Sequence, residues 1–133
     1  MAIFRRALNA VLGEPERLSA ALLARFPELG EVRVRRGGLP PRIGGWCLGC
    51  ATVAGITLGR TIWLANGIVP SAELLLHEVR HVHQFQAVPA FPLRYVFESL
   101  RRGYFHNRFE VDARRFAHER LRACRATLPS EGV

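Results

Sequence analysis

The sequence predicts a small α+β domain in which a short twisted sheet packs against two long helices. Its 133 residues, 49% of them hydrophobic, suit a single domain with a substantial core. Short runs rich in apolar and β-branched residues lie within residues 31–66, as is typical of strands. Residues 70–86 and 107–126 each follow a helix start signal and carry apolar residues at helical spacing.

The first 27 residues are expected to cover the core with two short amphipathic helices. These helices are Met1–Leu12 and Pro15–Phe26. The opening lacks the form of a secretory leader, because the apolar stretch after Arg5 and Arg6 is weak and soon broken. A cytoplasmic location is therefore expected.

Residues 31–66 are expected to supply the strands. Glu31–Arg36 alternates and suits an edge strand, whereas residues 37–45 have the composition of a loop. Residues 52–58 and 61–65 are apolar and β-branched, and the Gly-Arg pair between them suits a tight hairpin. The uncharged stretch that contains the first of these strands has too many glycines for a membrane span.

Three cysteines are present, and two of them form the string CLGC at Cys47 and Cys50. A structural zinc site needs four ligands, and only Cys124 remains among the cysteines. Buried thiols or a local disulfide are the preferred interpretation of the pair. The odd number of cysteines favours a reducing compartment.

The most informative string is HEVRH at residues 77–81, an instance of HExxH. Positions four apart lie on one face of a helix, so His77 and His81 can both present a ring nitrogen to one Zn²⁺. Glu78 follows the first histidine and is placed to act as the general base on a water molecule at that ion. The motif predicts a zinc-dependent hydrolase of peptide bonds.

The motif requires a helix, and residues 70–86 have the signals of one. Pro70 and Ser71 form a start signal, and Glu73 lies in the first turn, where a carboxylate suits the helix dipole. The apolar residues of this segment surround it on several sides, so it is expected to be a buried helix. Two histidines and a glutamate on a buried helix need a reason.

A third metal ligand is expected from the C-terminal helix, residues 107–126, which Asn107 can cap. Glu110 and Asp112 are the acidic candidates there. Two residues apart on a helix, they point about 200° apart, so both cannot face one ion without distortion.

The chain resembles the gluzincin branch of the zincin metallopeptidases, in which a glutamate on a second helix completes HExxH. The matching strings are HEVRHVHQ, NRFEVDARRFA and the predicted hairpin AGITLGRTIWLA, and together they span roughly residues 50–118. The resemblance implies a zincin-like fold, Zn²⁺ as cofactor and Glu110 as third ligand. It also implies that Gln84 holds the helix or a ligand, and that Thr61–Ala65 receives the peptide substrate as an added strand, with residues 52–58 as the other candidate edge.

Two positions depart from the pattern of that family. Arg80 occupies a motif position from which the stricter form excludes charge, so it is expected to point away from the metal. The aspartate that relatives carry four residues after the glutamate is replaced by Arg114, while an acid stands at Asp112. Asp112 is interpreted as either a partner of a ligand or a rival ligand.

Other polar residues near the two helices are candidates for supporting roles. Tyr104, His106 and Tyr95 could each stabilise the oxyanion of amide hydrolysis. His83 and His118 are interpreted as surface or packing residues.

All 19 basic residues are arginine, against 11 acidic ones, so the net charge is +8. The preferred interpretation is a solvated positive surface, with peptides rather than nucleic acid as partners. Two alternatives stay open: a catalytically silent metal-binding scaffold that acts as an interaction module, and an arginine-rich binder of nucleic acid or anionic surfaces. Association with a membrane surface, through the uncharged stretch or the N-terminal helix, is also open, and the oligomeric state is not predicted.

Overall fold

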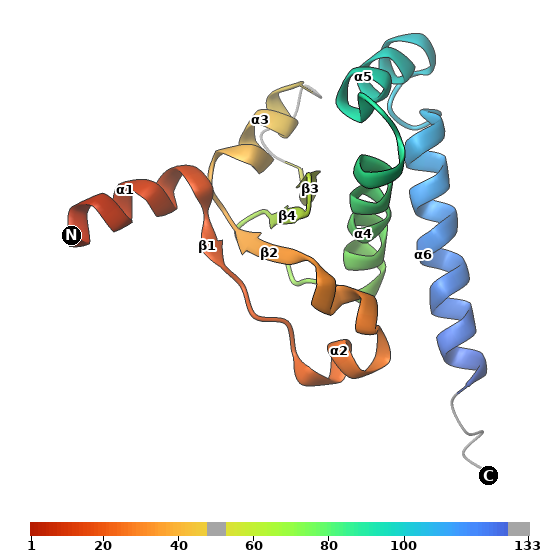
Figure 1. Ribbon diagram of the computed structural model, residues 1–133, viewed down its shortest axis with the longest axis horizontal. Coiled ribbons are helices and arrows are strands. Elements are labelled where there is room, and N and C mark those ends of the chain that lie inside the picture. The colour runs from red at the N-terminus through yellow and green to blue at the C-terminus, as the bar shows by residue number, and fades with distance from the viewer. Residues whose placement is uncertain (48–52, 128–133) are drawn as a thin grey trace.

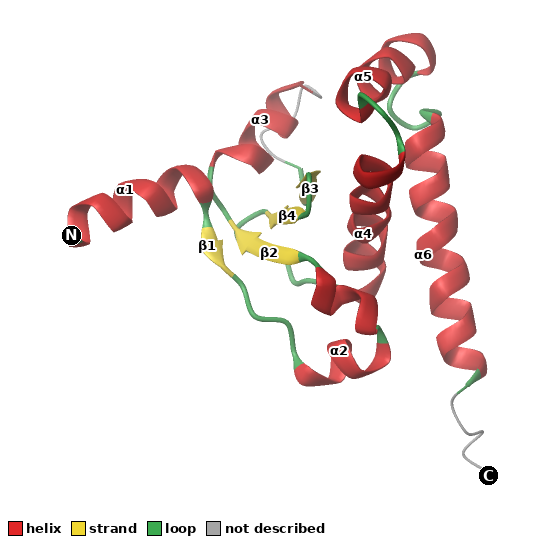
Figure 2. Cartoon of the chain, in the orientation of Figure 1, coloured by secondary structure: helices red, strands yellow, loops and turns green. Residues whose placement is uncertain are grey.

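The chain forms a small sheet with helices around it (Figures 1 and 2). The computed structural model describes residues 1–47 and 53–127. Within those residues the elements are α1 (Ala2–Leu12), β1 (Glu14–Pro15), α2 (Ala20–Arg25), the 3-10 helix η1 (Pro27–Glu31), β2 (Arg33–Arg36), α3 (Leu39–Cys47), β3 (Gly55–Leu58), β4 (Thr61–Leu64), α4 (Ala72–Ala87), α5 (Phe91–Arg102) and α6 (Arg108–Ala126). The predicted α+β class is confirmed.

The four strands form one mixed sheet in the order β1-β2-β4-β3. The expected hairpin is present, since β3 and β4 pair antiparallel with Leu58 opposite Thr61. Strand β2 pairs parallel to β4 on one side and antiparallel to the two-residue β1 on the other. The prediction of an edge strand at Glu31–Arg36 was therefore wrong, because a short partner from a distant segment covers that edge.

The strand expected to receive a substrate is also corrected. Thr61–Ala65 corresponds to β4, which lies between β2 and β3 and has its backbone paired on both sides. Among the described residues, β3 is the edge strand on this side of the sheet, and it packs against α4. A strand added to this sheet beside α4 would have to pair with β3.

Two proline-containing segments differ from the prediction. Residues 37–45 were expected as a loop, but Leu39–Cys47 is helix α3. Its Pro40 and Pro41 stand in the first turn, where backbone N–H groups have no helical partner, so they do not oppose the helix. Pro15–Phe26 was expected as one helix, but Pro15 belongs to β1, and α2 begins only after Ser19, whose side chain accepts from Leu22 N at 3.2 Å.

Helix α4 lies between the sheet and α6 (Figure 1). Leu75, Leu76 and Val79 are fully buried, and they share a core with Ile62 and Leu64 of β4. Ser71 caps the helix by accepting from Leu74 N at 3.1 Å, as expected from the sequence. The prediction of a buried helix carrying HEVRH is confirmed.

Helix α5 was not predicted from the sequence. It begins after Ala90, which has a left-handed backbone (φ 53°), and carries Pro92 in its first turn. It ends at Gly103, whose φ of 78° is a conformation that favours glycine. In this position Pro92 removes no helical hydrogen bond, so it does not oppose the helix.

No helix among the described residues is long and apolar enough to cross a membrane. Cys124 is a buried free thiol of α6. The prediction for Cys47 and Cys50 lies outside what the structure describes, which excludes residue 50 and the side chain of residue 47. Of the N-terminal segment expected to cover the core, α1 has no buried residue, while Leu22 and Leu23 of α2 pack against the core.

Candidate metal centre

His77, His81 and Glu110 meet at the contact between α4 and α6. One ligand atom from each residue can be chosen so that all three lie within 4.8 Å of one another. Glu110 Oε2 is 2.9 Å from His77 Nε2, and Glu110 Oε1 is 3.2 Å from His81 Nε2. His81 and Glu110 are buried, and His77 is partly exposed. We call these three residues the metal cluster.

Local signals in the sequence place these side chains. His77 and His81 are one helical turn apart on α4, and their rings meet edge to face with centroids 5.0 Å apart. Asn107 caps α6 by accepting from Phe109 N at 2.9 Å. Because the cap sets where α6 begins, Glu110 lies in its first turn and faces α4.

Gln84 determines which nitrogen of His81 faces the metal cluster. Its amide nitrogen has two acceptors, Phe109 O at 3.0 Å and Asp112 Oδ2 at 2.9 Å, so its amide oxygen must face His81 Nδ1, at 2.7 Å. His81 therefore donates from Nδ1 and keeps Nε2 as the ligand atom. The resemblance to the gluzincins implied such a holding role for Gln84.

Asp112 is a supporting residue in this arrangement. It accepts from Arg80 Nε at 2.7 Å and from Gln84, and it is not one of the three residues that converge. These donors lower the pKa of Asp112 against the opposing effect of its partial burial. Of the two acidic candidates, Glu110 is the one that the structure places with the histidines.

Glu110 also accepts a hydrogen bond from helix α5. The hydroxyl of Tyr95 donates to Glu110 Oε1 at 2.5 Å. Burial opposes ionisation of Glu110, but hydrogen bonds from His77, His81 and Tyr95 outweigh it and hold the pKa of Glu110 well below its usual range. Tyr95 therefore bonds the carboxylate that completes the metal cluster.

Glu78 is buried beside the metal cluster, with its carboxylate against strand β3. Thr57 Oγ1 donates to Glu78 Oε2 at 2.7 Å, and a Cβ on Gly55 would lie 3.1 Å from Glu78 Oε1. Burial raises the pKa of Glu78, although His81, Thr57 and His77 partly oppose this shift. Thr57 thus holds one oxygen of the carboxylate, and a Cβ at position 55 would be in tight contact with the other.

Tyr104 and His106 occupy different environments. Tyr104 is 44% exposed, but burial of its hydroxyl and the negative charges of Glu110 and Glu78 raise the pKa of that hydroxyl to about 12. His106 is exposed, its ring packs on Phe105, and it makes no hydrogen bond to a described residue of the cluster. The carboxylates of the site thus act on the hydroxyl of Tyr104, whereas no contact of this kind involves His106 among the described residues.

The other histidines match their predictions. His83 packs its ring against Phe116 of α6 with centroids 5.7 Å apart. His118 is exposed and lies 3.3 Å from the exposed Glu73. Neither belongs to the metal cluster.

Two residues of the site were not singled out from the sequence, namely Thr57 and Gly55. Both residues belong to β3, twenty or more residues before Glu78 in the chain. They contact Glu78 only because β3 packs against α4. A threonine and a glycine in a strand carry no local signal for such a contact.

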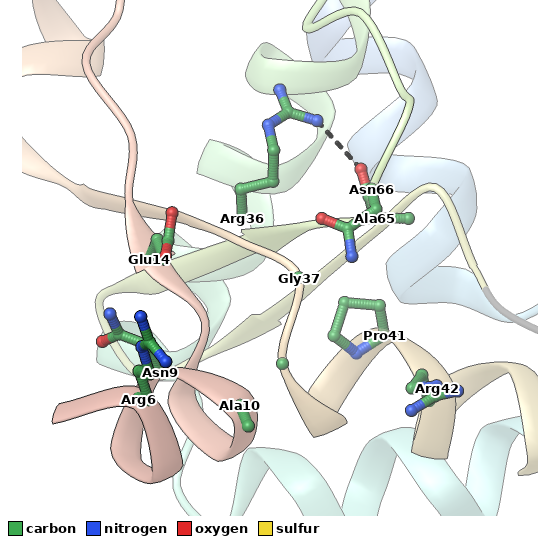
Figure 3. A pocket seen from close by; sticks show the side chains of 11 residues that line it. Arg6, Asn9, Ala10, Glu14, Arg36, Gly37, Pro41, Arg42, Ala65 and Asn66 are labelled. Carbon is green, nitrogen blue, oxygen red and sulfur yellow. Dashed lines mark hydrogen bonds between the residues drawn. The ribbon is translucent and has the colours of Figure 1, made fainter. Parts of the chain in front are cut away.

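A separate hollow of about 840 Å³ lies between α1, β2 and α3 (Figure 3). Arg36 is one of the residues that line this hollow, and it donates to Ala65 O at 2.9 Å. None of its lining residues belongs to the metal cluster. The residues that line the hollow do not form a group of metal ligands, so we place the candidate site at the metal cluster.

The residues of the cluster suit a transition metal. Two imidazole nitrogens and one carboxylate oxygen form a donor set of catalytic zinc sites, in which a fourth position stays open. The ionised carboxylate of Glu110 is in the state that metal binding requires, and His81 Nε2, which faces that carboxylate, would bind the ion in its deprotonated form. Other divalent transition metals accept the same donors.

Comparison of the chain with protein-family models, with curated proteins and with solved structures finds no match. The residues of the metal cluster and their neighbours therefore have to indicate the function.

Proposed function

We propose that the protein is a zinc-dependent peptidase of the gluzincin type with a zincin-like fold. The observation that supports this most is the position of Glu78. It lies next to a cluster of two histidines and a glutamate, buried and held at one carboxylate oxygen by Thr57. A metal site that only binds has no need of a carboxylate in this position.

His77, His81 and Glu110 would hold the Zn²⁺. The ion, when bound, acts as a Lewis acid on a peptide carbonyl and lowers the pKa of water. Gln84 accepts from Nδ1 of His81 and so leaves Nε2 to the ion, and Tyr95 orients the carboxylate of Glu110.

Glu78 would transfer the protons of the hydrolysis. Because Thr57 occupies Oε2, the transfer takes place at Oε1. A buried carboxylate beside the metal cluster can accept a proton from water and return it to the leaving amine. The Tyr104 hydroxyl, which stays protonated, would donate a hydrogen bond to the oxyanion.

A peptide would bind along β3. This strand has an unpaired edge among the described residues and packs against α4, so its backbone groups can pair with an extended chain beside Glu78. A peptide is the class of substrate that a free strand edge recognises.

Metal content and turnover test the proposal together. Protein without a His-tag is purified and reconstituted with zinc as wild type, Glu110→Ala and Glu78→Gln, and metal is measured by elemental mass spectrometry. We expect about one zinc per chain in the wild type and in Glu78→Gln, and loss of zinc in Glu110→Ala.

Cleavage is then measured on a mixed library of unstructured peptides by mass spectrometry. We expect products with the wild type and none with Glu78→Gln, although that variant keeps its zinc. Zinc binding without products from the wild type would indicate a silent scaffold instead. Folded wild-type protein that takes up no zinc would contradict both interpretations.

A further inference from the structure

One face of helix α5 is apolar and exposed to solvent. Leu93, Val96, Phe97 and Leu100 are 74%, 54%, 62% and 83% exposed. Side chains spaced by three and four residues lie on one side of a helix, so these four form a continuous line. We call them the α5 stripe. Figure 1 shows α5 at one end of the molecule, beyond α4 and α6.

The opposite face of α5 attaches the helix to the rest of the protein. Phe91 and Glu98 are buried on that face, and Tyr95 donates to Glu110 of α6. Asn107, which is fully buried, donates to Tyr95 O at 3.0 Å and to Ser99 Oγ at 2.8 Å. These contacts fix the helix with its apolar stripe facing outward, and the exposed apolar line is larger than scattered surface residues explain.

The exposed charged residues of α5 all have one sign. Arg94 and Arg101 are exposed and lie on the same side of the helix, about 90° from the centre of the stripe. Neither forms an ion pair with a described residue. Glu98, the sole acidic residue of α5, is buried with Arg102 Nε 3.6 Å from its carboxylate. The outward face therefore presents apolar side chains and unpaired positive charge.

We propose that the α5 stripe docks on the surface of an anionic lipid bilayer. The four apolar side chains would enter the boundary between headgroups and acyl chains, and Arg94 and Arg101 would lie at the level of the lipid phosphates. The charges favour this occupant over a second copy of the chain. A symmetric dimer through the stripe would bring the same arginines of two molecules together, each molecule with a net charge of +8.

Docking does not depend on catalysis at the metal cluster. Tyr95, on the attached face of α5, bonds Glu110, so the docked helix holds the cluster about one helix diameter, ~10 Å, from the bilayer.

Flotation with lipid vesicles tests this proposal. The full chain is mixed with vesicles of phosphatidylcholine alone or with phosphatidylglycerol added. We expect flotation with the anionic vesicles that weakens as salt is added. Phe97→Ser combined with Leu100→Ser should lower the partition coefficient about tenfold or more, since it removes two apolar side chains from the stripe.

The matched control lies on α1. Ile3 and Phe4 are 84% and 73% exposed, so replacing both by serine removes a similar apolar pair from another exposed helix. This variant should float as the wild type does. Arg94→Glu with Arg101→Glu, which leaves the apolar side chains in place, should lose binding to the anionic vesicles. Unchanged far-ultraviolet circular dichroism establishes that each variant is folded.

Quenching by brominated lipids locates the contact. A tryptophan introduced as Phe97→Trp should be quenched by anionic vesicles containing brominated acyl chains, and one introduced as Phe4→Trp should not. Absence of flotation, equal losses in the α1 and α5 variants, or quenching at position 4 alone would overturn the proposal. So would a concentration-dependent dimer that the α5 variant abolishes while no protein floats, because the stripe would then be covered by a second copy.

Discussion

Arg80 and Asp112 form an ion pair across the contact between α4 and α6, with 2.7 Å between Nε and Oδ2. Both residues depart from the pattern of the family that the sequence resembles. Arg80 lies within HExxH, and Asp112 lies two positions after Glu110. The structure joins the two departures in one contact. Because Asp112 also accepts from Gln84, which accepts from His81, the pair supports the orientation of a metal ligand.

Removal of Asp112 should therefore weaken zinc binding without abolishing it. In Asp112→Ala, Gln84 loses one of the two acceptors that orient its amide. We expect zinc affinity to fall about tenfold, measured by competition with a chromogenic chelator, whereas Glu110→Ala should lose zinc entirely. Equal losses in the two variants would mean that Asp112 is itself a ligand.

Tyr95 and Tyr104 should act on different properties of the site. Tyr95→Phe removes the hydrogen bond to Glu110 Oε1, so zinc affinity should fall by about tenfold. Tyr104→Phe should keep its zinc and lower kcat by about 100-fold, because it removes a donor that acts on the transition state. Zinc titration and steady-state kinetics on both variants separate these effects. An unchanged kcat in Tyr104→Phe would exclude it as the oxyanion donor.

Gly55 should be required for turnover but not for metal. A Cβ at this position would lie 3.1 Å from Glu78 Oε1 and 3.3 Å from its Cδ, while Thr57 holds the other carboxylate oxygen. Gly55→Ala should displace the carboxylate and lower kcat by about tenfold or more with zinc content unchanged. Gly30→Ala, where a Cβ meets nothing within 4 Å, is the matched control and should behave as the wild type.

Local signals in the sequence were sufficient for the two helices that carry the metal cluster. Ser71 and Asn107 cap them as expected, and spacing alone put His77 and His81 on one face. These interactions are formed within one or two helical turns, so a short stretch of sequence contains them. The hairpin of β3 and β4 was also predictable, because its turn and both of its strands lie within one short stretch of sequence.

Features that depend on distant pairing were not predictable. The two-residue β1 pairs with the outer edge of β2, and only the folded chain shows that β4 is an inner strand of the sheet. Helix α3 was missed because its glycines and prolines have the composition of a loop, although a proline in the first turn removes no helical hydrogen bond. Helix α5 was not predicted at all. Thr57 reaches Glu78 only through the packing of sheet on helix.

Stability should depend on pH through Glu16, which lies far from the metal cluster. Arg36 donates to both of its carboxylate oxygens, at 2.5 and 2.7 Å, and these hydrogen bonds lower the pKa of Glu16 from 4.5. Since the pKa is lower in the folded than in the unfolded state, this pair stabilises the fold above about pH 4.5. The contribution is lost as pH falls through the folded pKa.

Glu16→Gln should therefore lower the free energy of unfolding at pH 7 by about 1 kcal/mol, as expected for a partly exposed bidentate pair. The difference in unfolding free energy between the wild type and this variant should shrink as pH falls below 4.5. In that range the Glu16 carboxylate becomes protonated first in the unfolded and then in the folded wild-type protein, and its charge no longer stabilises the fold. Urea denaturation of both proteins at several pH values measures this, with the exposed Glu14→Gln as control. A difference that stays constant with pH would show that packing of Glu16, rather than its charge, stabilises the contact between β2 and the segment after β1.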